Sequence, residues 1–430
     1  MKLKGAKKQT FFLTIVNAAV RAIGLCMRVL LSRLLGAEAM GIAELAQSIH
    51  MLAIAPLTSG LPVAITRLTA LADRSKQHFP LLAGLSLVRI ISFLLIPLLW
   101  ILSPRIAHLM GDVRVLPSLW FTAPCILVLG YSASYNGFCY GTNQITKPAT
   151  SELLEQITRF FLTLILLSSF SGLTLPWLAA IPVFSTFVAE IIGLIFVIAA
   201  LRIPPVEANL LRPWKKEIIK LAVPSTITRL LQTIIRSATS ILIPVRLQKS
   251  GLSPTEATAL LGMYNGMVSP ILMLPCIFTS ALAMVTMPKF ARSEENPAEL
   301  KRLLLLSMGT SIPTAALCAI LIFASSSLLA LHVYRVAELI PLFRLGAPLV
   351  VLYALTHISG SVLSALGEQN RAMYASVLVS LITLGATWMM CANPEWRIHG
   401  VVAAQYLGQL LSFFSSCIIF FLWRKERHPL

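Results

Sequence analysis

Long apolar stretches alternate with short polar connections along the whole chain. A helix that crosses the hydrocarbon core of a bilayer takes about 20 apolar residues, and each stretch is long enough to form one. The pattern therefore predicts an all-α polytopic membrane protein with about 12 transmembrane helices. The segments lie at about 11–35, 41–66, 80–102, 115–140, 149–170, 175–201, 217–243, 257–288, 303–330, 339–366, 372–392 and 398–423.

One connection differs from the others in its composition. Residues 202–220 combine prolines with a run of basic side chains that begins at Arg202. This composition is typical of a linker between two halves of a protein. We therefore expect an N-lobe of six helices over 1–205, a cytoplasmic linker over 206–216 and a C-lobe of six helices over 217–430.

The composition excludes a large soluble enzyme. Of the 430 residues, 57% are hydrophobic and 12% are charged, and the mean hydropathy is +0.82; a soluble domain has about 25% charged residues. The net charge of +18 would suggest nucleic-acid binding in a soluble protein. In a membrane protein it is typical of cytoplasmic loops, so we expect no nucleic-acid partner. The seven cysteines lie in apolar stretches without metal-ligand spacing, and we expect no metal site.

The basic residues also predict how the chain is oriented. With a cytoplasmic N-terminus, the inside segments hold 21 Lys and Arg residues and the outside loops hold six. Basic residues favour the cytoplasmic side, so both termini are expected there, and an odd number of spans would destroy this bias. The apolar run that follows Lys8 contains Arg21 and Arg28 and is too long for a cleaved signal peptide. We interpret it as a retained first span.

Eight arginines remain inside the predicted spans, and four of them form a repeat. Arg21 and Arg28 in the first span match Arg229 and Arg236 in the seventh, at a constant offset of 208 residues. Seven residues turn a helix by about 700°, so each pair lies on one face, two turns apart. Further matches follow in the same order: 60–66 with 280–286, 123–124 with 347–348, and 140–144 with 366–370. The repeat predicts two lobes related by a pseudo-two-fold axis along the membrane normal.

The cost of burying charge indicates a function for the paired arginines. A charged side chain at the centre of a bilayer costs several kcal/mol, and such residues usually line a pathway. Two pairs that face a shared cavity would attract a multivalent anion such as a pyrophosphate headgroup, because a guanidinium binds phosphate with two donors at once. The candidate substrate-binding residues are therefore Arg21, Arg28, Arg229 and Arg236. The alternative is that each snorkels or pairs with an acid.

The remaining span arginines are secondary candidates, together with one acid. Arg33 can snorkel to the interface, and Arg159 has Glu155 one turn earlier as a partner, so structural roles are favoured for both. Arg89 and Arg344 are solitary, and their roles stay open.

Helix-breaking residues lie at corresponding places in the second and eighth predicted helices. Breaks in matching segments of two halves are typical of helices that bend during transport. The expected hinge residues are Pro56, Gly60, Pro62, Pro270 and Pro275.

Three sequence blocks carry a family resemblance. Residues 21–41 begin Arg-Ala-Ile-Gly-Leu-Cys-Met-Arg, residues 60–66 read Gly-Leu-Pro-Val-Ala-Ile-Thr, and residues 135–159 contain Thr-Asn-Gln-Ile-Thr-Lys-Pro. With the repeat, they make the chain similar to the stage V sporulation protein B and polysaccharide-transporter branch of the multidrug/oligosaccharidyl-lipid/polysaccharide (MOP) exporter superfamily. MATE drug exporters and lipid II flippases belong to the same superfamily.

The resemblance implies a MATE-like fold and a flippase that is not an enzyme. Its cargo would be an undecaprenyl-pyrophosphate-linked saccharide, moved across the bacterial plasma membrane by alternating access during synthesis of peptidoglycan, spore cortex or another polysaccharide. Arg21 and Arg28 resemble arginines in the central cavity of the lipid II flippases. The implied partners are the membrane and an anionic lipid-linked sugar, and the chain is expected to act as a monomer.

The chain departs from the family pattern in two respects. It lacks two additional C-terminal helices that lipid II flippases commonly have, and its first and seventh helices lack the acids that drug exporters use for Na⁺ or H⁺ coupling. We expect no cofactor, and a coupling ion has no assigned site. Two alternatives stay open: a cation-coupled drug antiporter of the same fold, and a non-transporting scaffold for cell-wall or spore-cortex assembly.

Overall fold

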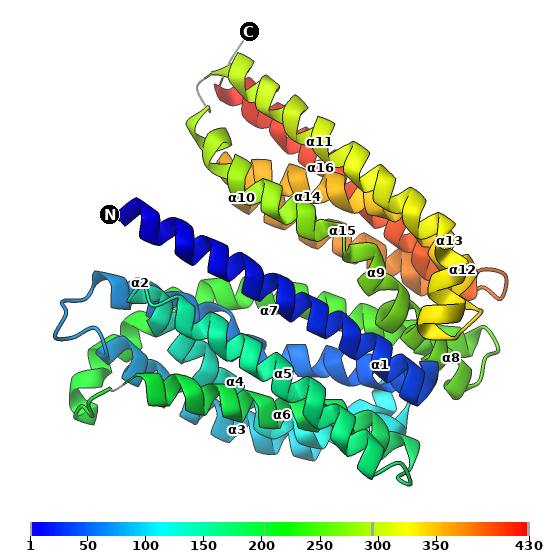
Figure 1. Cartoon of the computed structure of the whole chain (residues 1–430), viewed down its shortest axis with the longest axis horizontal. Coiled ribbons are helices and arrows are strands. Elements are labelled where there is room, and N and C mark those ends of the chain that lie inside the picture. The colour runs from blue at the N-terminus through cyan, green and yellow to red at the C-terminus, as the bar shows by residue number, and fades with distance from the viewer. Residues whose placement is uncertain (1, 202, 294–295, 428–430) are drawn as a thin grey trace. The chain divides into compact units, whose positions relative to one another are not determined.

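A computed structural model describes residues 2–201, 203–293 and 296–427 (Figure 1). The described residues are 88% helical and contain no strand. For residues 2–11, 14, 208, 281, 284 and 288 only the backbone is described. Among the basic residues used to predict the orientation, Arg202 and the side chains of Lys2, Lys4, Lys7 and Lys8 therefore lie outside the described residues.

The chain forms two compact units, Met1–Ile241 and Leu242–Leu430. The last helix of the first unit continues into the second. The first unit contains α1 (Lys2–Thr58), α2 (Gly60–Leu71), α3 (Phe79–Leu109), the 3-10 helix η1 (Val113–Val115), α4 (Leu116–Gly141), α5 (Thr146–Ser169), α6 (Leu175–Ala200), the 3-10 helix η2 (Ala208–Leu211) and most of α7 (Arg212–Lys249).

The second unit has more interrupted helices. Prolines and short π-helical turns divide two of its spans into pieces. Its elements are α8 (Pro254–Leu261), η3 (Gly262–Val268), α9 (Ser269–Met273), α10 (Cys276–Arg292), α11 (Pro297–Ala324), α12 (Ser326–Leu328), η4 (Leu329–Tyr334), α13 (Leu339–Gly346), α14 (Leu349–Ala365), α15 (Gln369–Met390) and α16 (Arg397–Arg427).

The long helix α1 consists of two helices joined at a kink. Gly36 has φ 78° and ψ 179°, which is not helical. This backbone conformation is open almost only to glycine. The kink falls between the predicted segments 11–35 and 41–66, and a second break at Ser59 separates α1 from α2.

The helices account for all the predicted apolar segments. In the described part of the chain, eight helices are long and apolar enough to cross a membrane, or up to ten if each of two bent pairs is one span. Two further features bear on the count of twelve. The 57 residues of α1 span about 85 Å if straight, enough for two crossings, and α5 is 24 residues long but carries charges such as Glu152 and Arg159. Twelve spans are therefore compatible with these helices.

The exterior of the helices is apolar. On α3, the side chains of Ile90, Phe93, Leu94 and Ile101 are 60% to 83% exposed. Soluble monomers rarely expose a contiguous apolar surface of this kind. Together with the number of long apolar helices, it identifies a multi-pass membrane protein.

Small residues allow the helices of the first unit to pack closely around α4. A side chain at Gly130 would collide with Leu57 and Val88, and one at Gly137 would collide with the backbone of Pro62. Membrane helices use small residues in this way because van der Waals contact, rather than hydrophobic burial, holds them together. The packing on α2 fixes one wall of the cavity described below.

The second unit has its own core beside the helix pair α14 and α16. Its helix bends coincide with prolines: α13 and α14 differ in direction by 44° across Ala347 and Pro348. Proline removes a backbone donor and clashes with the preceding turn, which bends a helix. The buried cluster consists of Phe290, Leu300, Ile358, Val362, Leu366 and Trp423.

Candidate functional site: a cavity beside Arg229

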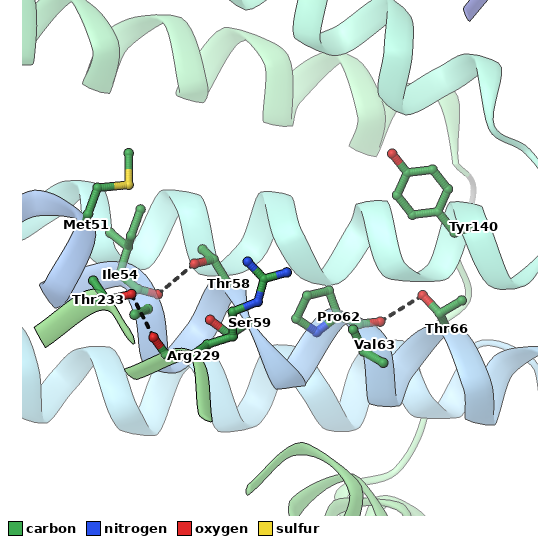
Figure 2. Close-up of a pocket in the computed structure, with 11 residues that line it drawn as sticks. Met51, Ile54, Thr58, Ser59, Pro62, Val63, Thr66, Tyr140, Arg229 and Thr233 are labelled. Carbon is green, nitrogen blue, oxygen red and sulfur yellow. Dashed lines mark hydrogen bonds between the residues drawn. The ribbon is translucent and has the colours of Figure 1, made fainter. Parts of the chain in front are cut away.

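The first unit contains a cavity of about 400 Å³ between α1, α2, α4 and α7 (Figure 2). We call it the Arg229 cavity. Its lining combines hydroxyl groups, small apolar side chains and one cation. The lining residues are Met51, Ile54, Ala55, Thr58, Ser59, Pro62, Val63, Thr66, Tyr140, Arg229 and Thr233.

The break between α1 and α2 brings α7 to this cavity. Ser59 is not helical, with φ −102° and ψ −86°, and Gly60 follows it at the start of α2. The backbone N–H of Gly60 donates to Thr226 Oγ1 at 3.2 Å, and a side chain at Gly60 would collide with the carbonyl oxygen of Ala222. This close approach of α7 places Arg229, one turn after Thr226, in the cavity wall.

The threonines of the cavity donate their hydrogens to the backbone. Thr58 and Thr233 each donate to the carbonyl four residues earlier, at 3.0 Å and 2.8 Å (Figure 2). Thr66 donates to the carbonyls of Pro62 at 2.8 Å and Gly137 at 2.9 Å. Because each hydrogen is used, the hydroxyl oxygens remain as acceptors. Acceptors of this kind suit the hydroxyl groups of a sugar.

The guanidinium of Arg229 is the charged group of this lining. In the described part of the chain, Arg229 forms no ion pair. Figure 2 shows its side chain among those of Thr58, Ser59 and Pro62. An arginine keeps its charge even when buried, so the cavity attracts anions. Its five donors match the oxygens of a phosphate or carboxylate.

A second cavity, of about 250 Å³, contains another of the predicted arginines. It lies between the two halves of α1 and helices α5 and α6, and we call it the Arg28 cavity. Arg28 donates to Glu44 Oε1 at 2.7 Å. The first predicted span has no acid, but the fold supplies one from the next predicted segment.

The four candidate arginines differ in their surroundings. Arg28, which is half-buried, and Arg229, which is exposed, line two different cavities of the first unit, whereas Arg21 and Arg236 are exposed and line neither of these two. Convergence of all four on one shared cavity stays a prediction.

Glu155 and Arg159 do not pair as their spacing predicts. Glu155 Oε1 accepts a hydrogen bond from Ser151 Oγ at 2.8 Å, and its side chain packs against Gly193. Arg159 forms no ion pair in the described part of the chain, and its Nε is buried without a hydrogen-bond partner. Glu155 and Arg159 interact electrostatically but form no direct ion pair among the described residues, because Ser151 and the space beside Gly193 hold Glu155, while Arg159 lines the Arg28 cavity.

The other secondary candidates lie apart from both cavities. Arg33 and Arg89 are exposed. In the second unit, Arg344 Nε donates to Ser326 Oγ at 3.1 Å, and its guanidinium lies 5.9 Å from the ring centre of Phe323. These contacts favour a structural role for Arg344.

The expected hinge residues lie at breaks between helices. Pro56 is in the last turn of α1, Gly60 begins α2, and Pro62 lies in its first turn. In the second unit, Pro270 is in the first turn of α9 and Pro275 directly precedes α10, where the helix direction changes by 51°. Bending of these breaks during transport stays a prediction.

The hydroxyl lining of the Arg229 cavity was not predicted from the sequence. Thr58, Ser59, Tyr140 and Thr233 come from three helices, and no spacing relates them. Thr233 alone carries a signal, since it lies one turn after Arg229 on the same helix face.

The helices define an all-α polytopic membrane protein. The sequence matches the polysaccharide biosynthesis protein family over residues 6–294. The chain belongs to this family, and the resemblance seen in its sequence blocks is confirmed.

Similar proteins include a curated relative and solved structures of transporters. Stage V sporulation protein B of Bacillus subtilis (strain 168) is 24% identical, over 94% of this chain and 81% of that protein. An inward-facing MATE family multidrug resistance transporter of the MOP superfamily has a TM-score of 0.76 at 16% identity, with 94% of each chain covered. The lipid II flippase MurJ in an inward closed conformation also has a TM-score of 0.76, at 14% identity, covering 94% of this chain and 87% of that one. At these identities the solved structures establish the fold.

Proposed function

We propose that the protein is a flippase for a saccharide linked to a membrane lipid through an anionic phosphate or pyrophosphate group. The family match over residues 6–294 supports transport for polysaccharide synthesis. One of the structures with the same fold is a lipid II flippase, and the sequence relative is a sporulation protein. An undecaprenyl-pyrophosphate carrier in the bacterial plasma membrane, with both termini of the protein in the cytoplasm, is the cargo and placement we propose.

The observation that carries the anionic cargo is the unpaired guanidinium of Arg229 in a hydroxyl-lined cavity. Arg229 would hold phosphate oxygens with two donors, and the threonine oxygens nearby would accept hydrogen bonds from the sugar. The lipid tail would stay in the apolar core of the bilayer, so the protein would not need to bind it. No covalent bond changes, so the protein acts by binding the headgroup and changing conformation, without catalysis.

A vesicle assay tests this proposal. The full chain is reconstituted into liposomes, and translocation of a polyprenyl-pyrophosphate-linked sugar is compared with that of the same sugar on a neutral polyprenol. We expect Arg229→Ala to lower the initial rate about 10- to 100-fold, because hydrogen bonds to a charged group are worth about 1.5–3 kcal/mol. Arg229→Lys should restore part of the rate, since an ammonium lacks the planar fork.

The matched control is Arg105→Ala. Arg105 is an exposed arginine in α3 that lines neither cavity, so its loss should leave the rate unchanged. Equal translocation of the charged and neutral carriers, or an unchanged rate in Arg229→Ala, would overturn the anionic cargo. Uptake of a cationic drug in place of either lipid would instead support the antiporter alternative.

A further inference from the structure

The Arg28 cavity lies between elements that are distant in sequence. Its walls come from both halves of α1, from α5 and from α6, all within the first unit. Its volume of about 250 Å³ is below the roughly 300–1,000 Å³ of pockets that enclose a drug-sized molecule. It therefore suits a compact chemical group. The polar side chains in the lining are Arg28, Glu44, Gln47, His50, Gln156, Arg159 and Thr186.

The kink in α1 creates an ion pair at one side of this cavity. Arg28 and Glu44 are 16 residues apart, which is about 24 Å along an unbroken helix. Their side chains nevertheless meet at 2.7 Å, because the chain folds back at Gly36. The side chains are 38% and 18% exposed, so the protein encloses neither of them completely. The pair is therefore able to open.

Two polar groups of the lining have no hydrogen-bond partner in the described part of the chain. Arg159 Nε is buried with no acceptor, because Glu155 accepts from Ser151 instead. His50 is 6% exposed, and its Nδ1 is buried without a hydrogen bond. Buried polar groups are almost always hydrogen-bonded, and an exception indicates a missing ion, water or ligand. The N–H of a guanidinium is a donor only, so the group that Arg159 lacks is an acceptor.

The charged side chains of the lining favour an anionic acceptor. Arg28 and Arg159 bring two positive charges to the lining and Glu44 brings one negative charge, while the buried acids Glu155 and Glu190 act on Arg159 from outside the lining and leave its Nε without an acceptor. A phosphate group has oxygens on several sides and can bind two guanidinium groups from different walls. A single carboxylate presents two oxygens in one plane, which suits one guanidinium.

We propose that the Arg28 cavity is a second phosphate-binding site and that Glu44 is a tethered competitor for it. In the absence of phosphate, Glu44 occupies Arg28. A phosphate or pyrophosphate group of the cargo displaces Glu44 from Arg28 and supplies the acceptor that Arg159 lacks. This inference rests on the proposed function, since it assigns a further contact to the same anionic cargo.

The exchange keeps Arg28 neutralised throughout. An unpaired guanidinium within a membrane-spanning helix costs several kcal/mol, whereas replacing one anion by another avoids that state. Loss of the pair also removes one side-chain link between the two halves of α1.

The test measures binding of inorganic pyrophosphate to the purified full chain by calorimetry. All variants carry Arg229→Ala, so that the Arg229 cavity does not contribute. We expect Glu44→Gln to raise the affinity about tenfold, because the competitor is neutralised, and Arg28→Gln and Arg159→Gln each to lower it at least tenfold. Arg105→Gln should have no effect, since it lies outside both cavities.

The opposite signs distinguish competition from a structural ion pair. If the pair only stabilised the fold, Glu44→Gln and Arg28→Gln would both lower the melting temperature and shift the affinity in the same direction. That result would overturn the proposal. Unchanged affinity in both Glu44→Gln and Arg159→Gln would also overturn it, provided that the melting temperatures show folded protein.

A second titration identifies the source of the phosphate. Polyprenyl pyrophosphate in mixed micelles should displace inorganic pyrophosphate from the site, while polyprenol should not. Failure of polyprenyl pyrophosphate to compete would overturn the assignment to the cargo lipid and leave the site to free phosphate. Translocation by the wild type is measured separately. If the wild type translocates the lipid but the variants bind pyrophosphate with unchanged affinity, this inference alone fails. If the variants change the affinity as expected but the wild type does not translocate the lipid, the proposed function alone fails.

Discussion

Arg28 and Arg229 show how the same side chain acquires different properties from its neighbours. Arg229 lines its cavity without an acid, so an incoming anion meets a guanidinium that is already available. Arg28 is held by Glu44, so an anion must compete for it. The spacing of six residues between arginines predicts the two positions but not this difference, because Glu44 reaches Arg28 only through the fold of α1.

Arg159 shows the limit of local spacing as evidence. A glutamate one turn before an arginine favours a pair on an isolated helix by about 0.2–0.5 kcal/mol. Inside a packed unit, Ser151 and the space beside Gly193 hold Glu155 elsewhere. Such a small local preference is overridden by packing, and the sequence alone does not contain that information.

At the residue scale, we predict that Gly60→Ala destabilises the protein. A Cβ there would collide with the Ala222 carbonyl oxygen and lie 2.6 Å from Ser225 Oγ and 2.5 Å from Thr226 Oγ1. Backbone atoms cannot yield as a side-chain end can, and overpacking costs about 1–3 kcal/mol. The control is Gly309→Ala in α11, where nothing lies within 4 Å. Melting temperatures in detergent should fall for Gly60→Ala only, and equal values for both variants would contradict this packing.

Among the elements, the helices were predictable and their internal breaks only in part. A span carries its signal in its own apolar residues, so each of the predicted segments corresponds to described helix. The prolines around 56–62 and 270–275 correctly mark places where helices end. Gly36 was not singled out as a break, because an isolated glycine in an apolar segment is common in membrane helices.

The repeat is visible in local structure within each unit. Thr66 in α2 and Thr286 in α10 belong to matched blocks, and each donates to the carbonyl four residues earlier, at 2.8 Å and 2.9 Å. The matched blocks around Gly141 and Gly367 each join one helix to the next. Equivalent local roles in both halves favour the duplication that the sequence predicts.

At the element scale, we predict that the kink in α1 requires glycine at position 36. Gly36→Ala should either strain the backbone by about 1–3 kcal/mol or straighten the helix, and both lower stability. The measurement is the yield of a cross-link formed by a short bifunctional maleimide between Arg28→Cys and Glu44→Cys, in a chain whose native cysteines are replaced. The yield should fall with Gly36→Ala and stay unchanged with Gly385→Ala, a helical glycine of α15 with open space around it. A high yield with Gly36→Ala would show that another residue tolerates this conformation.

For the whole molecule, the distribution of charge explains both the membrane orientation we propose and an apparent exception. By composition alone, helix α5 does not qualify as a membrane span, because Lys147, Glu152, Glu155 and Arg159 lie within it. Glu155 is buried against α6, and Arg159 faces the Arg28 cavity. Because these charges turn toward protein and away from lipid, α5 is able to cross the bilayer despite its composition.

We therefore predict that the two ends of α5 lie on opposite sides of the membrane. In a cysteine-free chain, Asn143→Cys in the turn before α5 and Gly172→Cys in the turn after it are treated with a membrane-impermeant maleimide in intact cells. The excess of basic residues in the predicted inside segments places Asn143 in the cytoplasm, so only Gly172→Cys should react before lysis and both should react afterwards. Reaction of both in intact cells would mean that α5 does not span, and would also reverse the assigned side of every segment that precedes it, including the N-terminus.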